Sequence, residues 1–270
     1  PGSPVWWPRE KRAVENQTCR ELIKAEKITK RFGNLVAVDN VDFVLYENEM
    51  AGIIGSNGAG KTTFFNILTG YFFPDEGKVS YENRDVTRLS PQKRVGMGIM
   101  RTFQLTSTFD NLKVVDNMSL SFFRAHRTSS TFRLLTNTLA AFRSEERIWK
   151  CLEDFDLAEI ADREVKSLSL GEKRRLEIAM AVLAEPKVLL LDEPLAGLSE
   201  SEISGLLNIL QSHAHRQTIL LVEHKISKVQ DILDRLIVMH EGKVIAEGDC
   251  GECLAAPEVR RSYWQLDCDE

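Results

Sequence analysis

A glycine-rich segment at residues 55–63 limits the possible folds of this chain more than any other stretch. It reads Gly-Ser-Asn-Gly-Ala-Gly-Lys-Thr-Thr, follows the apolar run 51–54 and precedes apolar residues at helical spacing from Phe64 to Leu68. A strand, a glycine turn and a helix in this order form a P-loop, in which backbone N–H groups turn inward on an anion. The helix N-terminus adds its dipole. The sequence therefore predicts a nucleoside triphosphate site in an α/β fold.

The residues of this segment have distinct expected contacts with the nucleotide. We expect Lys61 to reach the β- and γ-phosphates and the Thr62 hydroxyl to ligate Mg²⁺. An accidental turn rich in Gly, Ser and Asn is the alternative, and the strand and helix on either side argue against it. The predicted phosphate-binding residues are Gly55, Ser56, Asn57, Gly58, Ala59, Gly60, Lys61, Thr62 and Thr63.

Charge and hydropathy restrict the class of partner. The formal net charge is -5 over 270 residues, which argues against a broad nucleic-acid-binding surface. No uninterrupted apolar run is long enough to span a bilayer, so a membrane role must come through a partner. The beginning of the sequence lacks the apolar core of a signal peptide. These features predict a cytoplasmic chain.

The five cysteines do not suggest a disulfide framework, because their number is odd in a chain of this length. Cys250 and Cys253 have the spacing of a metal or redox pair, but no second pair accompanies them. We expect them to lie at a turn near the start of a helix.

Two boundaries are expected along the chain. Residues 1–20 are charged and interrupted by proline, which predicts a poorly ordered tail before a domain at residues 21–270. Residues 22–28 and 37–45 alternate like half-buried strands. The segment 30–33 between them reads as a turn, and its aromatic residue Phe32 is either a core or turn aromatic or a stacking face for adenine.

The middle of the chain is expected to be helical. No strand pattern occurs from about residue 114 to residue 157, which predicts a helical subdomain, at about 105–180, inserted into the nucleotide-binding body. Ser169 and Gly171 suit the start of a later helix, with Glu172 in its first turn. Pro186 is expected to end that helix.

Two carboxylates close a second buried strand. The apolar run 188–191 leads into Asp192 and Glu193, as expected of a central parallel strand with a functional C-terminal end. We expect Asp192 to hold Mg²⁺ and Glu193 to polarise the attacking water. A helix cap with a neighbouring solvated charge is the alternative.

Two further polar residues follow expected strands. His224 comes after the apolar strand 218–222, and its position favours a bond to a γ-phosphate oxygen over a purely structural role. Gln104 follows the strand expected at 99–103 and could reach the Mg²⁺ or the water.

Taken in order, the P-loop, Gln104, the segment 168–172, the Leu-Asp-Glu-Pro segment 191–194 and His224 resemble the ATP-binding subunit of ABC transporters. The resemblance covers nearly the whole chain from Leu22. Its most specific part is the signature Ser-Leu-Gly-Glu at 169–172, which ordinary P-loop kinases and GTPases lack. It implies a P-loop NTPase ABC cassette with a RecA-like core, an antiparallel β subdomain and an inserted α-helical subdomain.

The resemblance also implies a working dimer of ATPase subunits, packed head to tail. Ser169, Gly171 and Glu172 of one chain would then complete the ATP site held by the P-loop of the other, of the same or a similar chain. Phe32 would stack on adenine, and Gln104 would sense the γ-phosphate. Residues 108–112 would lie near a membrane permease.

Three residues depart from the family pattern. Leu170 stands in the signature where glycine is commonest, and Ser199 stands where an aspartate usually follows Glu-Pro-x-x-Gly-Leu. Ser199 puts communication between the two ATP sites in doubt. Phe32 replaces the commoner tyrosine, which is compatible with stacking.

A finer resemblance concerns the transported solute. The segments 31–38, 101–104, 194–198 and 257–263 resemble the branched-chain amino-acid import ATPases, which act with a permease and, indirectly, a solute-binding protein. Urea or amide importers and the lipopolysaccharide-export ATPase are near relatives. A soluble ABC ATPase that acts on nucleic acid and a non-catalytic regulatory cassette are the remaining alternatives.

Overall fold

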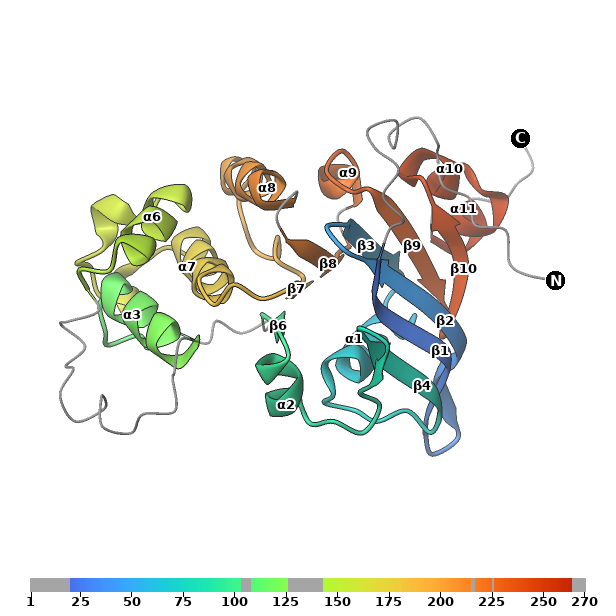
Figure 1. Ribbon diagram of the computed structural model, residues 1–270. Helices are drawn as coiled ribbons and strands as arrows, with labels where there is room; N and C mark the ends of the chain where they lie inside the picture. The colour runs from blue at the N-terminus through green and yellow to red at the C-terminus, as the bar shows by residue number, and fades with distance from the viewer. Residues whose placement is uncertain (1–19, 103–107, 126–142, 215–216, 225, 264–270) are drawn as a thin grey trace. The chain divides into compact units, whose positions relative to one another are not determined.

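The computed structural model describes residues 20–102, 108–125, 143–214, 217–224 and 226–263 (Figure 1). Residues 1–19 of the predicted tail and Gln104 lie outside these ranges. The chain divides into two compact units. The first joins residues 1–97 with 214–270, and the second comprises residues 98–213.

The first unit contains an antiparallel sheet in the strand order β2-β1-β4-β5. Its strands are β1 (Glu21–Phe32), β2 (Leu35–Tyr46), β4 (Glu76–Tyr81) and β5 (Arg84–Asp85). The two strands predicted at 22–28 and 37–45 are confirmed, and both are longer than predicted. The turn predicted at residues 30–33 is wrong in its bounds, because pairing of β1 with β2 continues to Phe32 opposite Leu35. Phe32 is therefore the last residue of a strand.

A mainly parallel sheet forms the core of the first unit. β3 (Met50–Gly55) lies between β8 (Thr218–Val222) and β9 (Arg235–His240), parallel to both, and β10 (Lys243–Gly248) pairs antiparallel with β9. Every residue of β3 and β8 is buried, as expected for strands that are covered on both faces. The helices of this unit are α1 (Lys61–Thr69), α2 (Pro91–Gly96), α9 (Ile226–Val229), α10 (Cys250–Ala255) and α11 (Pro257–Tyr263).

In the second unit the short strand β6 (Ile99–Arg101) runs parallel to β7 (Val188–Asp192), which is buried along its whole length. Its helical elements are α3 (Val114–Ala125), α6 (Glu146–Asp154), the 3-10 turns η1 (Ala158–Ile160) and η2 (Val165–Ser167), α7 (Leu170–Val182) and α8 (Glu200–Ala214). The Ser121 hydroxyl joins α3 to α7 by donating to the Met180 carbonyl at 2.6 Å.

The predicted end of α7 at Pro186 is wrong, since the helix already ends at Val182. Glu185 takes a left-handed φ of 50°, a conformation that cannot continue a right-handed helix. The helix has therefore already ended before the chain reaches Pro186.

In the part of the chain that the structure describes, no helix combines the length and apolar character needed to cross a membrane.

A fully buried arginine stabilises the C-terminal end of α1. The guanidinium of Arg94, from α2, donates to the carbonyls of Ile67 at 2.8 Å and Leu68 at 2.6 Å. These are among the last carbonyls of the helix, which cannot continue its regular hydrogen-bond pattern, and a cation is favourable there. Burial lowers the pKa of Arg94 to about 10. Arg94 thus fixes the helix that begins at the P-loop.

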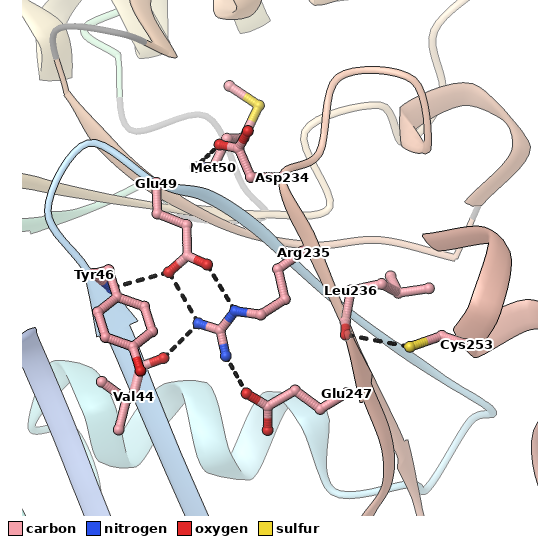
Figure 2. Close-up of polar contacts among 9 residues, drawn as sticks. All are labelled: Val44, Tyr46, Glu49, Met50, Asp234, Arg235, Leu236, Glu247 and Cys253. Atoms are coloured by element: carbon pink, nitrogen blue, oxygen red, sulfur yellow. Dashed lines mark hydrogen bonds and ion pairs between the residues drawn. The ribbon is translucent and has the colours of Figure 1, made fainter. Parts of the chain in front are cut away.

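A second buried arginine, Arg235, joins the two sheets of the first unit (Figure 2). It donates to Glu49 at 2.6 and 2.9 Å, to the Val44 carbonyl of β2 at 2.5 Å, and to Glu247 of β10. Burial by itself lowers the pKa of Arg235, but the hydrogen bonds and charges of Glu49 and Glu247 outweigh it, so that the pKa is raised. The guanidinium is therefore charged, and each of its three nitrogens donates a hydrogen bond.

Replacement of Arg235 by methionine should destabilise the protein strongly. The side chain of Glu49 is only 3% exposed, so Arg235→Met leaves a buried carboxylate without its cation. Loss of one partner of a buried pair typically costs about 3–5 kcal/mol, which urea unfolding would measure. Glu247→Gln is the matched control, because the Glu247 side chain is 38% exposed and the pair with Glu49 remains. Equal stability of the two variants would contradict this account.

Candidate functional site

The glycine-rich loop between β3 and α1 lies against neighbouring backbone. A Cβ on Gly55 would stand 2.2 Å from the Met239 carbonyl oxygen, and a Cβ on Gly60 would stand 2.3 Å from that of Ala37. Gly60 is also the N-cap of α1, with a left-handed φ of 93°. Only glycine permits this approach and this conformation. The loop therefore turns tightly enough to present its N–H groups and the start of α1 to an anion.

Lys61 carries the positive charge of this loop. Its side chain is buried, and its ammonium donates to the carbonyls of Gly55 at 2.7 Å and Ser56 at 2.9 Å. The ammonium thus lies across the loop and not in solvent. Thr62 is exposed, with its hydroxyl in the first turn of α1. This arrangement can bind a phosphate group and leaves Thr62 accessible to a metal ion.

His224 belongs to the same edge of the parallel sheet as the P-loop. Ile53 of β3 is paired with Val222 of β8, so the carboxyl ends of both strands point the same way. His224 is exposed, and its backbone N–H donates to the Glu223 carboxylate at 3.2 Å. The structure therefore brings His224 to the sheet edge at which ligands of α/β proteins bind.

Phe32 is exposed and is not a core residue. The residue is 44% exposed, and its ring forms a T-shaped pair with the ring of Phe72 at a centroid distance of 5.5 Å. The Lys30 ammonium lies over the Phe32 ring, 5.6 Å from its centroid. The Lys30 ammonium is itself held by Asp75 at 2.9 Å. The ring is thus held by Phe72 and Lys30 and still retains accessible surface, which suits stacking on a base.

In the second unit, Asp192 ends β7 with its side chain almost fully buried. One oxygen, Oδ2, accepts from the Arg101 guanidinium at 2.5 Å. The other oxygen, Oδ1, is buried and has no hydrogen-bond partner within the described residues. Buried carboxylate oxygens are normally paired, and a lone one is a suitable ligand for a hard cation such as Mg²⁺. Asp192 therefore fits its predicted role.

Glu193 has an unusual backbone conformation. Its φ is 46°, in the left-handed region that non-glycine residues seldom adopt and that is often found at functional sites. The carbonyl of Glu193 accepts from Arg174 at 3.1 Å and from the N–H of Ala196 at 3.1 Å. Arg174 is in turn paired with Glu177 at 2.7 Å. These contacts hold the strained turn in place.

The predicted helix start at Ser169 is confirmed. The Ser169 hydroxyl accepts from the Glu172 N–H at 3.1 Å, and the Glu172 carboxylate accepts from the Ser169 N–H at 2.7 Å. This is a reciprocal capping box at the N-terminus of α7. The carboxylate of Glu172 therefore caps its own helix in this structure.

The signature segment also contacts the segment that contains Ser199. A Cβ on Gly171 would stand 2.1 Å from the Glu202 carboxylate, and a Cβ on Gly197 would stand 2.7 Å from the Leu170 side chain. Ser199 donates its hydroxyl to Glu202 at 2.7 Å. Hydrogen bonds from Ser199 lower the pKa of Glu202. Leu170 and Ser199, two of the three departures from the family pattern, are thus accommodated in one local arrangement.

The cysteine pair lies at the start of α10. Cys250 is the first residue of α10, after the N-cap Asp249, and Cys253 donates to the Leu236 carbonyl at 3.7 Å (Figure 2). Within the described ranges, no group of three or more His, Cys, Asp or Glu side chains could hold a metal ion. The placement of the pair at a helix start is confirmed.

The predicted site residues are divided between the two units. The P-loop, Phe32 and His224 belong to the first unit, whereas Asp192, Glu193 and the signature belong to the second. Sequence reasoning assigned no role to Arg101 or Arg174. For Arg101 a signal existed, because a charged residue that ends a short apolar strand needs a partner if it is buried.

Comparison with known proteins identifies the family of this arrangement. A family model described as ABC transporter matches residues 38–196. A high-affinity branched-chain amino acid transport ATP-binding protein, LivG of Salmonella typhimurium, is 38% identical over 90% of this chain and 97% of its own length. The corresponding protein BraF of Pseudomonas aeruginosa is 35% identical over 90% and 98%.

Solved structures agree with this result. A nucleotide-free ATP-binding cassette from an ABC transporter has a TM-score of 0.77 and 30% identity, over 90% of this chain and 98% of its own. The ADP conformation of an ATP-binding cassette of an ABC transporter has a TM-score of 0.77 and 32% identity, over 91% and 99%. The predicted fold class is therefore confirmed.

A methyl group at Gly60 should damage the phosphate-binding loop. Gly60→Ala imposes a left-handed conformation on alanine and a clash with the Ala37 carbonyl, with a strain of about 1–3 kcal/mol. We expect weaker ATP binding by calorimetry, by about tenfold or more. Gly205→Ala, in α8, is the control, since a Cβ there meets no atom within 4 Å. Unchanged affinity in Gly60→Ala would show that the loop does not bind the phosphates.

Proposed function

The chain belongs to the ABC transporter family of ATP-hydrolysing cassettes, and we propose that it powers the import of branched-chain amino acids through a membrane permease. One observation carries the choice of solute: over 90% of this chain, the identity to LivG (38%) and to BraF (35%) is higher than the identity to the lipopolysaccharide-export protein LptB (31%). In this proposal the solute is bound by the permease and a solute-binding protein, and the chain lies at the inner face of the cell membrane through the permease.

We assign the triphosphate to the P-loop. The N–H groups of residues 55–63 and the Lys61 ammonium hold the phosphates, and the exposed ring of Phe32 stacks on adenine. The close approach of Gly55 and Gly60 to neighbouring carbonyls supports this assignment, because it fixes the loop before the ligand arrives. The placement of Phe32 at the end of a strand supports its proposed stacking on adenine.

We assign the hydrolytic step to residues that follow the buried strands. Glu193 orients and polarises the attacking water, while His224 donates to a γ-phosphate oxygen. Thr62, Asp192 and Gln104 would hold Mg²⁺, which when bound neutralises charge on the β- and γ-phosphate oxygens. The lone buried oxygen of Asp192 and the left-handed backbone of Glu193 support these roles.

The second half of each ATP site is proposed to come from another ATPase subunit, either the same chain or a similar one. Ser169 and Gly171 would then cap the γ-phosphate held by the other chain, while Glu172 caps the start of the helix that carries them. A bacterial ABC transporter cassette with a TM-score of 0.71 and 25% identity has been solved as a dimer, which supports this proposal. ATP would favour the closed dimer and hydrolysis would release it, as a ligand-driven shift in population.

The helices α3, α6 and α7 belong to the inserted helical subdomain that we propose for residues 105–180.

A second candidate function is lipopolysaccharide export. The ATP-binding protein LptB of Acidithiobacillus ferridurans is 31% identical over 90% of this chain and 96% of its own length. Isolation of the chain with its permease, followed by identification of that permease, distinguishes the two functions.

Glu193→Gln should separate ATP binding from hydrolysis. The amide cannot accept a proton from water, so we expect turnover to fall by about 10²–10⁴, with ATP affinity retained. ATP should then hold the dimer, visible as a doubled mass in light scattering. Glu159→Gln is the control, since Glu159 is exposed and outside every predicted site. Rapid turnover in Glu193→Gln would exclude the role given to Glu193.

A further inference from the structure

A largely buried arginine adjoins the carboxylate that we propose as a Mg²⁺ ligand. Arg101 is the last residue of β6, which runs parallel to β7, and it is paired opposite Leu190. Its side chain is 9% exposed and that of Asp192 is 2% exposed, with 2.5 Å between Nη2 and Oδ2. The pair therefore places one positive and one negative charge together away from solvent.

This ion pair differs from two other arginine–carboxylate pairs in the chain. Arg143 donates to both oxygens of Asp116, at 2.7 and 2.9 Å. Arg235 donates to both oxygens of Glu49, at 2.6 and 2.9 Å. Such two-bond pairs satisfy the whole carboxylate. Arg101, in contrast, neutralises the charge of Asp192 while one of its oxygens lacks a hydrogen bond from the described residues.

The incomplete pairing has a direct chemical meaning. A purely structural ion pair gains from full hydrogen bonding, because an unsatisfied buried oxygen is unfavourable. A carboxylate that also binds a cation needs one oxygen without a hydrogen bond. It also needs a nearby positive charge that compensates its own charge before the cation binds. The single bond from Arg101 meets both needs.

We propose that Arg101 is a positioning residue that compensates the charge of Asp192 in the absence of Mg²⁺ and thereby limits how strongly ATP binding depends on Mg²⁺. This inference rests on the proposed function, since it takes Asp192 as a Mg²⁺ ligand for the bound nucleotide. With Arg101 present, the carboxylate repels the phosphates of metal-free ATP only weakly. Without Arg101, the same carboxylate is an uncompensated anion, and Mg²⁺ becomes more necessary.

The experiment compares the dissociation constant of a fluorescent ATP analogue in EDTA and in saturating MgCl₂. For each variant, the dissociation constant in EDTA divided by that in MgCl₂ gives the metal dependence. A general loss of stability affects both constants and largely cancels in this ratio. Arg101→Gln should raise this ratio about tenfold, as expected for one uncompensated charge. Arg101→Lys keeps the charge and should change the ratio by less than about threefold. An unchanged ratio in Arg101→Gln overturns the proposal.

Two controls identify the cause of any change. Arg143→Gln breaks a two-bond pair in the same unit and should leave the ratio unchanged. Asp192→Asn should reduce the ratio; if it does not, the proposed role of Asp192 fails. If Asp192→Asn reduces the ratio and Arg101→Gln leaves it unchanged, only the inference about Arg101 fails.

A further pair of variants covers the case in which Arg101→Gln does not fold. In Asp192→Asn, Arg101 has lost its counter-charge and should strengthen the binding of ATP in EDTA. The double variant, Arg101→Gln with Asp192→Asn, contains neither buried charge and should lose this gain. Equal affinities of the single and double variants in EDTA overturn the proposal.

Discussion

The close approach of two glycines to neighbouring backbone carbonyls is the constraint on which the phosphate-binding loop depends. Gly55 and Gly60 let the loop lie against β9 and β2, and this position starts α1 directly after the turn. At the other end of the same helix, Arg94 donates to the last carbonyls. The helix is therefore fixed at both ends, and its N-terminal N–H groups are preorganised for an anion.

The second unit holds its chemical residues by short contacts within itself. Arg101 neutralises Asp192, Arg174 holds the carbonyl of the left-handed Glu193, and Glu202 connects the segment after Glu193 to the signature at Gly171. The signature and the carboxylates are thus parts of one local arrangement. In the proposed dimer, binding of the signature to the partner's ATP could therefore affect the position of Glu193, because only a few side chains of the same unit separate them.

Much of this could be predicted from the sequence, because the patterns are local. The P-loop, the buried strands that end at Asp192 and Val222, and the capping box of Ser169 with Glu172 each depend on residues within a few positions of one another. The family resemblance added the dimer and the solute. The pair of Arg101 and Asp192 could not be predicted, since its partners are 91 residues apart and no periodicity connects them. The strand end at Phe32 was missed for a related reason, because cross-strand pairing extended the strand beyond its alternating pattern.

The central claim is that the signature of one chain completes the ATP site formed by the P-loop of another chain. The most direct test is the ATP affinity of Ser169→Arg, measured at a dilution where the chain is monomeric, beside its ATP-driven dimerisation. If the signature acts on the neighbour's nucleotide, monomer affinity stays at the wild-type value while dimerisation is lost. If Ser169→Arg instead weakens ATP binding to the monomer as much as Lys61→Ala does, the signature belongs to its own chain's site and the claim is contradicted.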